Sequence, residues 1–289
     1  HPLNRAVIDR ETKKVKEGYV IIQPEVRNHI PPANCSRFTL IFGGQSGLDS
    51  YSTVISDIYQ DIFGQAIYTG KGIYNVEAFH YLLDGVIQEN TVLSHDLLES
   101  CYTRCAFSSA AKIMDSFPSS VLSYIKREHR WIRGDWQLLP WLFLKDKTGR
   151  SLCALSKWKI FDNLRRSLVP GSKILFIILN LALLPDLFYL WLPLVFFNDI
   201  LNLIILLVTI IAKKISRPKL ALLYRQLIKD IYYTLERSFL ELVLTPYRAY
   251  SAYDAIIRTL YRLTVSKKNL LNWNTAEAVD ASIRNTKKG

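Results

Sequence analysis

The residues best suited to chemistry lie between Arg127 and Gln137, where three arginines and a histidine alternate with two tryptophans. Guanidinium groups hold phosphate oxygens through paired hydrogen bonds, and indole faces stack on flat rings such as sugars. The stretch therefore predicts a site for a ligand that is anionic at one end and hydroxyl-rich at the other. The alternative is an amphipathic surface helix whose tryptophans dock inward. The candidate binding residues of the predicted site are Arg127, Arg130, Trp131, Arg133, Asp135 and Trp136.

A second candidate is Asp96, which opens a predicted helix over residues 96–105 with Ser94 as its N-cap. An acidic residue in the first turn of a helix is common, because it complements the helix macrodipole, so a purely structural role is the alternative. A carboxylate at this place is also suited to taking a proton from a hydroxyl group, which is the task of a general base.

A glycine-rich turn interrupts a predicted strand over residues 66–74. It resembles a phosphate-binding loop, but five residues rather than four separate Gly64 from Gly70, and Gly72 stands where Ser or Thr would bind magnesium. We interpret Gly70, Lys71 and Gly72 as backbone that must come close to a ligand, with Lys71 at its edge.

The elements that position these residues form a predicted α/β region over residues 1–150. Residues 19–24 predict a short buried strand that is stopped by Pro24, and residues 107–114 predict another strand. Asn75 and Ser120 are suited to cap the helices that follow them. The helix after Ser120 carries the arginines and tryptophans.

The charge of this 289-residue chain is unevenly distributed. The net charge is +12, of which residues 1–150 hold only +1. A basic excess can indicate nucleic acid, but here it flanks long apolar runs, which favours an anionic membrane surface instead. We expect no nucleic-acid partner. The four cysteines are too few for a disulfide framework and complete no zinc site, so we expect free thiols in a reducing compartment.

Residues 174–212 carry only two formal charges, Asp186 and Asp199. A bilayer span needs about 20 residues, so the sequence predicts a transmembrane hairpin over residues 170–212, with spans near 170–185 and 190–212. The turn is expected at Pro185, and basic residues at both ends place both ends in the cytoplasm. One span followed by a re-entrant segment is the alternative.

The predicted hairpin has amphipathic neighbours. Residues 151–169 predict a helix that lies in the membrane interface. Residues 213–289 predict membrane-associated helices and a linker, with amphipathic patterns over 220–244 and 247–265 that are broken at Pro246.

Several of these segments together resemble the cyclic β-1,2-glucan synthases, which are large bacterial enzymes of the inner membrane. The segments are residues 1–5, 69–74, 89–99, 129–137 and 158–168, and the resemblance extends to about residue 275. It implies that residues 1–150 are the C-terminal half of a GT-A-like glycosyltransferase domain with its catalytic part in the cytoplasm. The partners it implies are UDP-glucose, a glucan acceptor, the lipid bilayer, and upstream and downstream domains of the same polypeptide.

The resemblance also implies a reaction, the processive inverting transfer of glucose to a growing β-1,2-glucan chain. Asp96 matches the general base, and Arg127-x-x-Arg130-Trp131 matches a Gln-x-x-Arg-Trp motif at the acceptor and diphosphate site, with Arg127 in place of Gln. The Gly70 turn would line the acceptor cleft. Mg²⁺ or Mn²⁺ would be bound upstream, so we expect no metal ligand here and no activity from this piece alone. A related β-glucan synthase of another linkage and a non-catalytic membrane scaffold are the alternatives.

Overall fold

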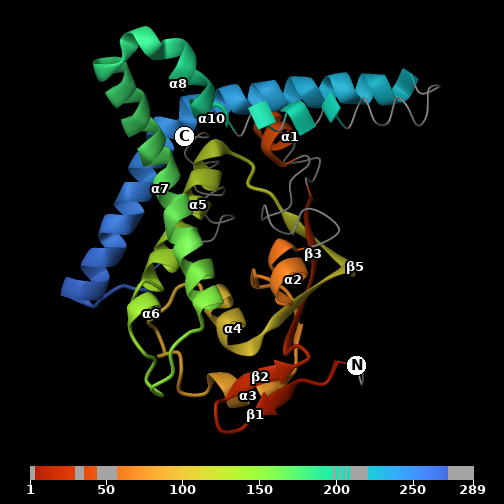
Figure 1. The fold of residues 1–289 in the computed structure, drawn as a ribbon, viewed down its shortest axis with the longest axis vertical. Coiled ribbons are helices and arrows are strands. Elements are labelled where there is room, and N and C mark those ends of the chain that lie inside the picture. The colour runs from red at the N-terminus through yellow and green to blue at the C-terminus, as the bar shows by residue number, and fades with distance from the viewer. Residues whose placement is uncertain are drawn as a thin grey trace, which may run out of the picture. The chain divides into compact units, whose positions relative to one another are not determined.

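The computed structural model describes residues 4–29, 36–43, 57–197, 200–201, 203–205, 207–208 and 221–272 (Figure 1). The chain divides into two compact units, of which the first is His1–Ser167 with Asp254–Gly289 and the second is Leu168–Tyr253. Helices α7 (Ala154–Leu183) and α10 (Ala221–Tyr261) each contribute residues to both units.

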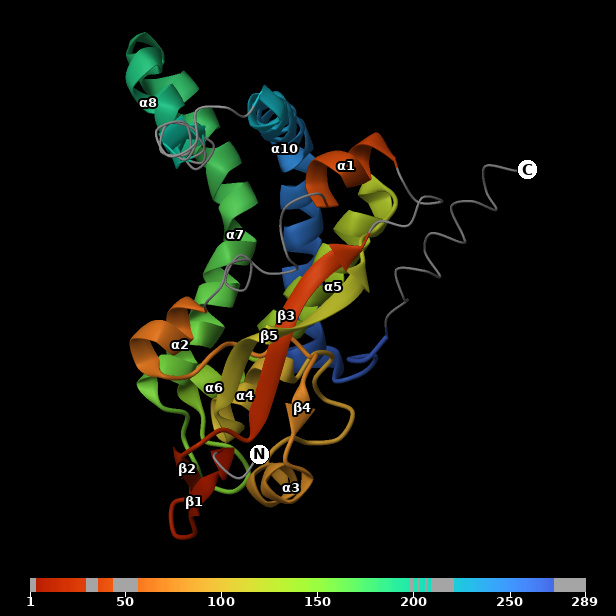
Figure 2. The ribbon, with the colours of Figure 1, turned by 90° about the vertical axis from the view of Figure 1, so that its right-hand side faces the viewer.

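The first unit is built on a three-stranded sheet of order β4-β3-β5 (Figure 2). Its central strand β3 (Ile21–His29) pairs in parallel with β5 (Cys105–Ser116) and antiparallel with the short strand β4 (Ile73–Tyr74). A separate hairpin joins β1 (Val7–Asp9) to β2 (Lys14–Glu17). The predicted mixed α/β class of this region is confirmed.

The prediction that Pro24 stops the first strand is wrong. Strand β3 continues to His29, and the register with β5 shifts between Pro24 and Glu25. Proline has no N–H group to donate to the ladder, and a bulge is one of the few places in a sheet that tolerates it. The proline therefore interrupts the pairing locally instead of ending the strand.

The helices of the first unit are short and mostly capped by side chains. Two predicted caps are confirmed: Asn75 Oδ1 accepts a hydrogen bond from the N–H of Ala78, and Ser120 forms a capping box with Ser123. The helices are α1 (Arg37–Gly43), α2 (Ile58–Phe63), α3 (Val76–Leu83), α4 (Asp96–Thr103), α5 (Val121–Gln137) and α6 (Pro140–Phe143), followed after α10 by the π-helix η4 (Arg262–Ser266).

Two apolar clusters hold these elements together. One joins α2, α4 and the start of α7 through side chains such as Tyr59, Leu98 and Ile160. The other joins the sheet to α3 through side chains such as Ile21 and Leu82. Burying an aliphatic side chain contributes about 1.5–3 kcal/mol. The first cluster therefore fixes α4, which begins with Asp96, and the second fixes the segment before Gly70 through Ala66 and Tyr68.

Helix α7 crosses a boundary that we predicted between residues 169 and 170. The interfacial helix and the first span were expected to be separate, but α7 is continuous through Pro170. Proline removes one backbone hydrogen bond from a helix interior without necessarily ending the helix. In the part of the chain that the structure describes, α7 is the one helix long and apolar enough to cross a membrane.

The predicted turn after the first span is found in the second unit. The 3₁₀ helix η3 (Pro185–Leu187) follows α7 and leads into α8 (Phe188–Val195). Part of the second predicted span, including residues 209–212, lies outside the described residues, so the hairpin over 170–212 stays a prediction.

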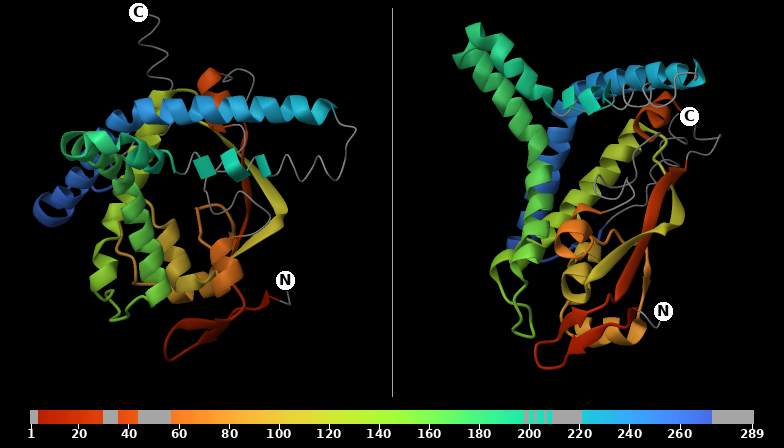
Figure 3. Two further views of the ribbon diagram at one scale, coloured as in Figure 1. Left: turned by 45° about the horizontal axis from the view of Figure 1, so that its top comes forward. Right: turned by 45° about the vertical axis from the view of Figure 1, so that its right-hand side comes forward.

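The break that we predicted at Pro246 is also wrong, because α10 runs from Ala221 to Tyr261 as one helix. It bends in its middle, between its cyan and blue halves (Figure 3). A bend rather than an end is the usual result when a proline removes one bond from a long helix that is packed on its neighbours. Within the second unit, α10 meets α7 closely, because a Cβ placed on Gly171 would overlap the hydroxyl oxygen of Tyr253.

We predict that the apolar part of α7 inserts into a bilayer and that Leu179→Arg prevents it. Leu179 is exposed in this structure, and an arginine at the centre of a span costs about 3 kcal/mol. The measurement is the inserted fraction of residues 167–187 placed in a host protein with glycosylation sites on both sides. Leu179→Ala is the matched control and should insert. Equal insertion of the Arg and Ala variants would contradict the prediction.

Candidate active site

Asp96 is the first residue of α4 and is partly buried. The N-cap position belongs to His95, which makes no side-chain capping bond, so the predicted capping by Ser94 is wrong. The hydroxyl of Ser94 instead donates to Asp96 Oδ2 at 3.2 Å. The serine thus orients the Asp96 carboxylate and does not cap the N-terminus of α4.

The surroundings of Asp96 favour its protonated form. Burial raises the pKa of this carboxyl group and the neighbouring Glu99 raises it further, while His95, Ser94 and Arg130 act in the opposite direction. A carboxylate whose pKa is raised toward neutrality accepts a proton more readily than an exposed one. Asp96 is therefore better suited to act as a base than an ordinary first-turn aspartate.

The glycine-rich turn lies directly against this carboxylate. Gly70 has a φ of +91°, and a Cβ built on it would lie 2.8 Å from Asp96 Oδ2. A Cβ on Gly72 would lie 2.7 Å from the carbonyl oxygen of Ile22 in β3. The turn is therefore held between the sheet and the start of α4, at a distance that only glycine allows.

Gln23 holds the segment that leads into this turn, and our sequence reasoning missed it. Its side chain is 1% exposed, and its Oε1 accepts hydrogen bonds from the N–H of Thr69 at 2.6 Å and from the Thr69 hydroxyl at 2.9 Å. Its Nε2 donates to the carbonyl of Ile67 at 3.2 Å. The available signal was an amide residue within an otherwise apolar strand, because a buried amide needs several partners.

Helix α5 approaches Asp96 from another direction. A Cβ on Gly134 would lie 2.9 Å from the Cβ of Ser94, and Gln137 Oε1 accepts the N–H of Leu93 at 2.6 Å. Burial lowers the pKa of Arg130, and the negative charge of Asp96 opposes that change, so the two groups interact electrostatically. The start of α4, the Gly70 turn and the middle of α5 thus meet at one place.

Arg127 and Trp131 form a stacked pair on α5, one helical turn apart. The guanidinium carbon of Arg127 lies 4.8 Å from the centre of the Trp131 ring and 5.3 Å from that of Phe117. Trp131 is 36% exposed, so part of the indole faces solvent. Arg127 Nε is buried and has no hydrogen-bond partner in the described structure, which leaves a donor for an anionic oxygen.

Two other candidates on α5 are used in contacts with α7. The indole N–H of Trp136 donates to the hydroxyl of Ser167 at 2.8 Å, and its ring packs against the first apolar cluster. Asp135 Oδ1 accepts a hydrogen bond from Asn163 Nδ2 at 3.0 Å. These contacts match the alternative that we set out for the stretch, in which a tryptophan docks inward.

Arg133 and Lys71 are also engaged with protein groups. Arg133 is 8% exposed and donates to the carbonyls of Leu270 at 3.2 Å and Asn272 at 2.8 Å. Lys71 Nζ lies 2.5 Å from Asp115 Oδ2 of β5, with both side chains about one-third exposed. Arg133 therefore fastens the segment after η4 to α5, and Lys71 fastens the glycine turn to the sheet.

A group of possible cation ligands surrounds the start of α4. One ligand atom each from His95, Asp96 and Glu99 lies within 4.8 Å of the others. His95 Nδ1 and Glu99 Oε1 already contact each other at 2.5 Å. Clusters of this kind are common at protein surfaces without an ion, so our expectation that the metal ligands lie upstream stays a prediction.

We predict that Gly70→Ala destabilises the protein more than Gly85→Ala. Both glycines have positive φ, which costs an alanine about 1–2 kcal/mol, but a Cβ at Gly85 meets nothing within 4 Å. The additional loss of stability in Gly70→Ala should come from the clash of the new Cβ with the Asp96 carboxylate. The measurement is the thermal midpoint of each purified variant. When Asp96 is replaced by Ala, the two glycine substitutions should lower the thermal midpoint equally. An equal decrease for both substitutions in the protein that keeps Asp96 would contradict the close contact.

No protein-family model matches the chain. Among curated proteins, the chain is 38% identical over 285 residues to the cyclic beta-(1,2)-glucan synthase NdvB of Rhizobium meliloti (strain 1021). The match covers 98% of this chain but only 10% of that protein. The resemblance that the motifs indicated is therefore confirmed over nearly the whole chain, which is similar to one segment of a much longer cyclic β-1,2-glucan synthase.

Proposed function

We propose that this chain forms the acceptor side of a membrane-bound inverting glycosyltransferase, which moves glucose from UDP-glucose to a growing β-1,2-glucan chain. The observation that carries the proposal is the convergence of the Gly70 turn and Arg130 on the partly buried carboxylate of Asp96. The 38% identity to a protein named as a cyclic beta-(1,2)-glucan synthase supports the choice of product.

In this proposal Asp96 is the general base. The acceptor hydroxyl attacks the anomeric carbon of the donor, a new glycosidic C–O bond forms, and the bond to the phosphate oxygen breaks on the opposite face. The hydroxyl proton passes to Asp96, and the electron pair of the broken bond leaves with UDP. The raised pKa of Asp96 favours that proton transfer, and Ser94 keeps one carboxylate oxygen oriented.

Two arginines of α5, Arg127 and Arg130, hold the leaving diphosphate. Arg130 lies close enough to interact with Asp96, and Arg127 has a buried Nε–H without a protein acceptor in the described structure. Cations placed where negative charge develops stabilise the transition state more than the ground state. The exposed part of Trp131 supplies the ring platform, and we assign Trp136, Asp135 and Arg133 to positioning α5 because their polar groups are engaged elsewhere.

The rest of the machinery belongs to other parts of the polypeptide. The chain spans about a tenth of the relative it matches, so the nucleotide-binding strands and the Mg²⁺ or Mn²⁺ ligands are assigned upstream. Helix α7 anchors this piece to the inner membrane, with the α/β unit on the cytoplasmic side where positively charged flanks are retained. The isolated piece is accordingly inactive.

We predict that Asp96→Asn abolishes sugar transfer by the full-length protein, because it removes the base while nearly preserving side-chain volume. The measurement is incorporation of labelled glucose by membranes with matched amounts of protein. Asp61→Asn is the control: Asp61 is an exposed first-turn aspartate of α2, so transfer should continue at the wild-type rate. Polymer synthesis by Asp96→Asn would exclude this residue as the base.

We also predict that Arg130→Ala weakens inhibition by the product UDP about 10- to 100-fold. A hydrogen bond to a charged group contributes about 1.5–3 kcal/mol, and about 1.4 kcal/mol corresponds to a factor of ten. Arg130→Lys should fall between the wild type and Arg130→Ala, because it keeps the charge but loses the guanidinium geometry. Arg27→Ala removes an exposed arginine of β3 and should leave the inhibition constant unchanged. An unchanged constant for Arg130→Ala would refute the diphosphate role.

A further inference from the structure

A cavity of the first unit lies between the β1–β2 hairpin, the end of α4 and the start of α7, and Asp96 is not part of its lining. Its volume is about 280 Å³. Its polar lining includes four basic residues and two cysteines, namely Lys13, Lys14, Arg104, Arg150, Cys101 and Cys153. The proposed transferase site uses none of these residues.

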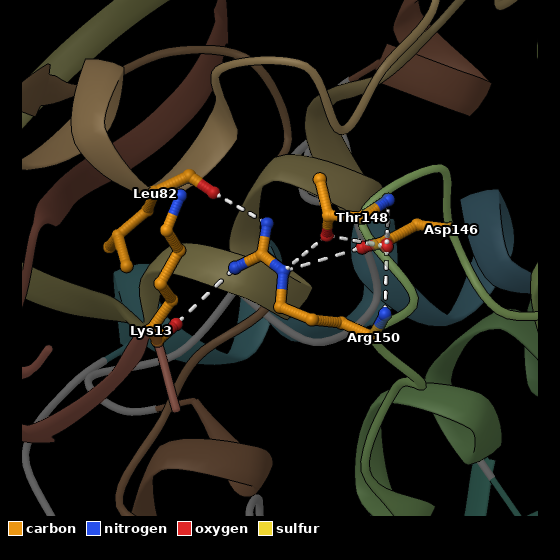
Figure 4. Close-up of polar contacts among 5 residues, drawn as sticks. All are labelled: Lys13, Leu82, Asp146, Thr148 and Arg150. Atoms are coloured by element: carbon orange, nitrogen blue, oxygen red, sulfur yellow. Dashed lines mark hydrogen bonds and ion pairs between the residues drawn. The ribbon is translucent and has the colours of Figure 1, made fainter. Parts of the chain in front are cut away.

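The lining of this cavity is cationic. Arg150 donates hydrogen bonds to the carbonyls of Lys13 and Leu82, at 3.4 and 2.9 Å (Figure 4). It also forms an ion pair with the carboxylate of Asp146 at 3.5 Å. Arg104 donates to the carbonyl of Gly64 at 3.2 Å. The charge of Arg150 is paired with the Asp146 carboxylate, whereas the carbonyl partner of Arg104 orients its guanidinium group without neutralising it. None of the described residues that line this cavity is acidic, so Lys13, Lys14 and Arg104 leave the lining with a net positive charge. The cavity therefore attracts anions.

Cys153 occupies the N-cap position of α7. It directly precedes Ala154, and its carbonyl accepts the N–H of Lys157 at 3.0 Å. Its Sγ lies 3.3 Å from the hydroxyl of Ser156. Partial burial acts to raise the pKa of this thiol, but hydrogen bonds from the Ser156 hydroxyl and from the N–H groups of Ser156 and Leu155 outweigh it and lower the pKa. A thiolate at an exposed N-cap is a reactive nucleophile.

Cys101 differs from Cys153 in the same cavity. Its Sγ lies 3.9 Å from the carbonyl oxygen of Ser156, and burial raises the pKa of its thiol to about 11. Cys153 is exposed, whereas Cys101 is only partly exposed. Both thiols contact Ser156, but the lower pKa of Cys153 gives it more thiolate than Cys101 at any given pH, so Cys153 is the better nucleophile of the two.

We propose that Cys153 is a covalent modification site for small anionic disulfides, which the basic lining of the cavity concentrates beside its sulfur. The Cys153 thiolate attacks one sulfur of the disulfide, a new S–S bond forms, and the old S–S bond breaks. The Cys153 sulfur is oxidised, and the departing thiolate is reduced and takes a proton from water. The disulfide itself is the oxidant, so the step needs no other reactant, and the inference does not depend on the proposed transferase activity.

The test compares two disulfides of opposite charge on the full-length protein in detergent. The probes are oxidised glutathione, which is anionic, and cystamine, which is cationic, and peptide mass spectrometry follows the mixed disulfide at Cys153. Each rate is divided by the rate with a short cysteine peptide, which removes the intrinsic reactivity of the probe. We expect the normalised rate with oxidised glutathione to exceed that with cystamine at least about tenfold at low salt.

Variants separate the parts of the proposal. Cys153→Ser should abolish the adduct while keeping a good helix cap, and Cys101→Ser should leave the adduct at Cys153. Lys14→Glu reverses one exposed charge of the lining, and it should lower the glutathione preference, as should 0.5 M salt. An unmodified Cys153, or equal normalised rates for the two probes, would overturn the proposal.

Discussion

The close contact between the backbone of Gly70 and the carboxylate of Asp96 is the constraint on which the rest of the site depends. It requires a residue without a Cβ at position 70, and it requires a segment before Gly70 that cannot shift. Gln23 meets the second requirement from the central strand, with three hydrogen bonds to Ile67 and Thr69. On the other side, Gly134 lets α5 come equally close to Ser94. Two glycines thus bring three elements to one carboxylate.

This arrangement costs stability at neutral pH. The pKa of Asp96 is raised in the folded protein, so the folded state binds a proton more tightly than the unfolded chain does. Its contribution to stability is therefore complete below the ordinary value of 3.8 and is lost as the pH rises through the folded-state pKa. The apolar cluster that includes Leu97 and Leu98 holds α4 in place against that cost. A titratable group whose pKa is held away from its ordinary value by its surroundings is typical of a functional site.

The sequence was most informative where a local rule decides the structure. Helix caps at Asn75 and Ser120 and the turn at Pro185 depend on neighbouring residues alone, and they are found as predicted. Two prolines, Pro24 and Pro246, were overinterpreted because a local rule alone was applied to them. At Pro24, Pro170 and Pro246 the element continues, because packing of a whole strand or helix outweighs one missing N–H group.

The candidate site was predicted in part, and helix geometry explains the limits. At about 100° per residue, Arg127, Arg130 and Trp131 share one face of α5, whereas Trp136 points to the opposite side and docks on α7. That division could have been read from the spacing. The roles of Gln23 and Gln137 could not, because their partners lie 44 or more residues away along the chain.

We propose above that these residues serve the transfer of glucose from UDP-glucose into a β-1,2-glucan. The most direct measurement is to incubate membranes carrying the full-length protein with radiolabelled UDP-glucose and Mg²⁺, and then to determine the linkages of any labelled polymer. We expect a glucan with β-1,2 linkages. Absence of transfer by intact protein would contradict the enzymatic assignment and favour a membrane scaffold, whereas a polymer of another linkage would contradict the assignment of the product.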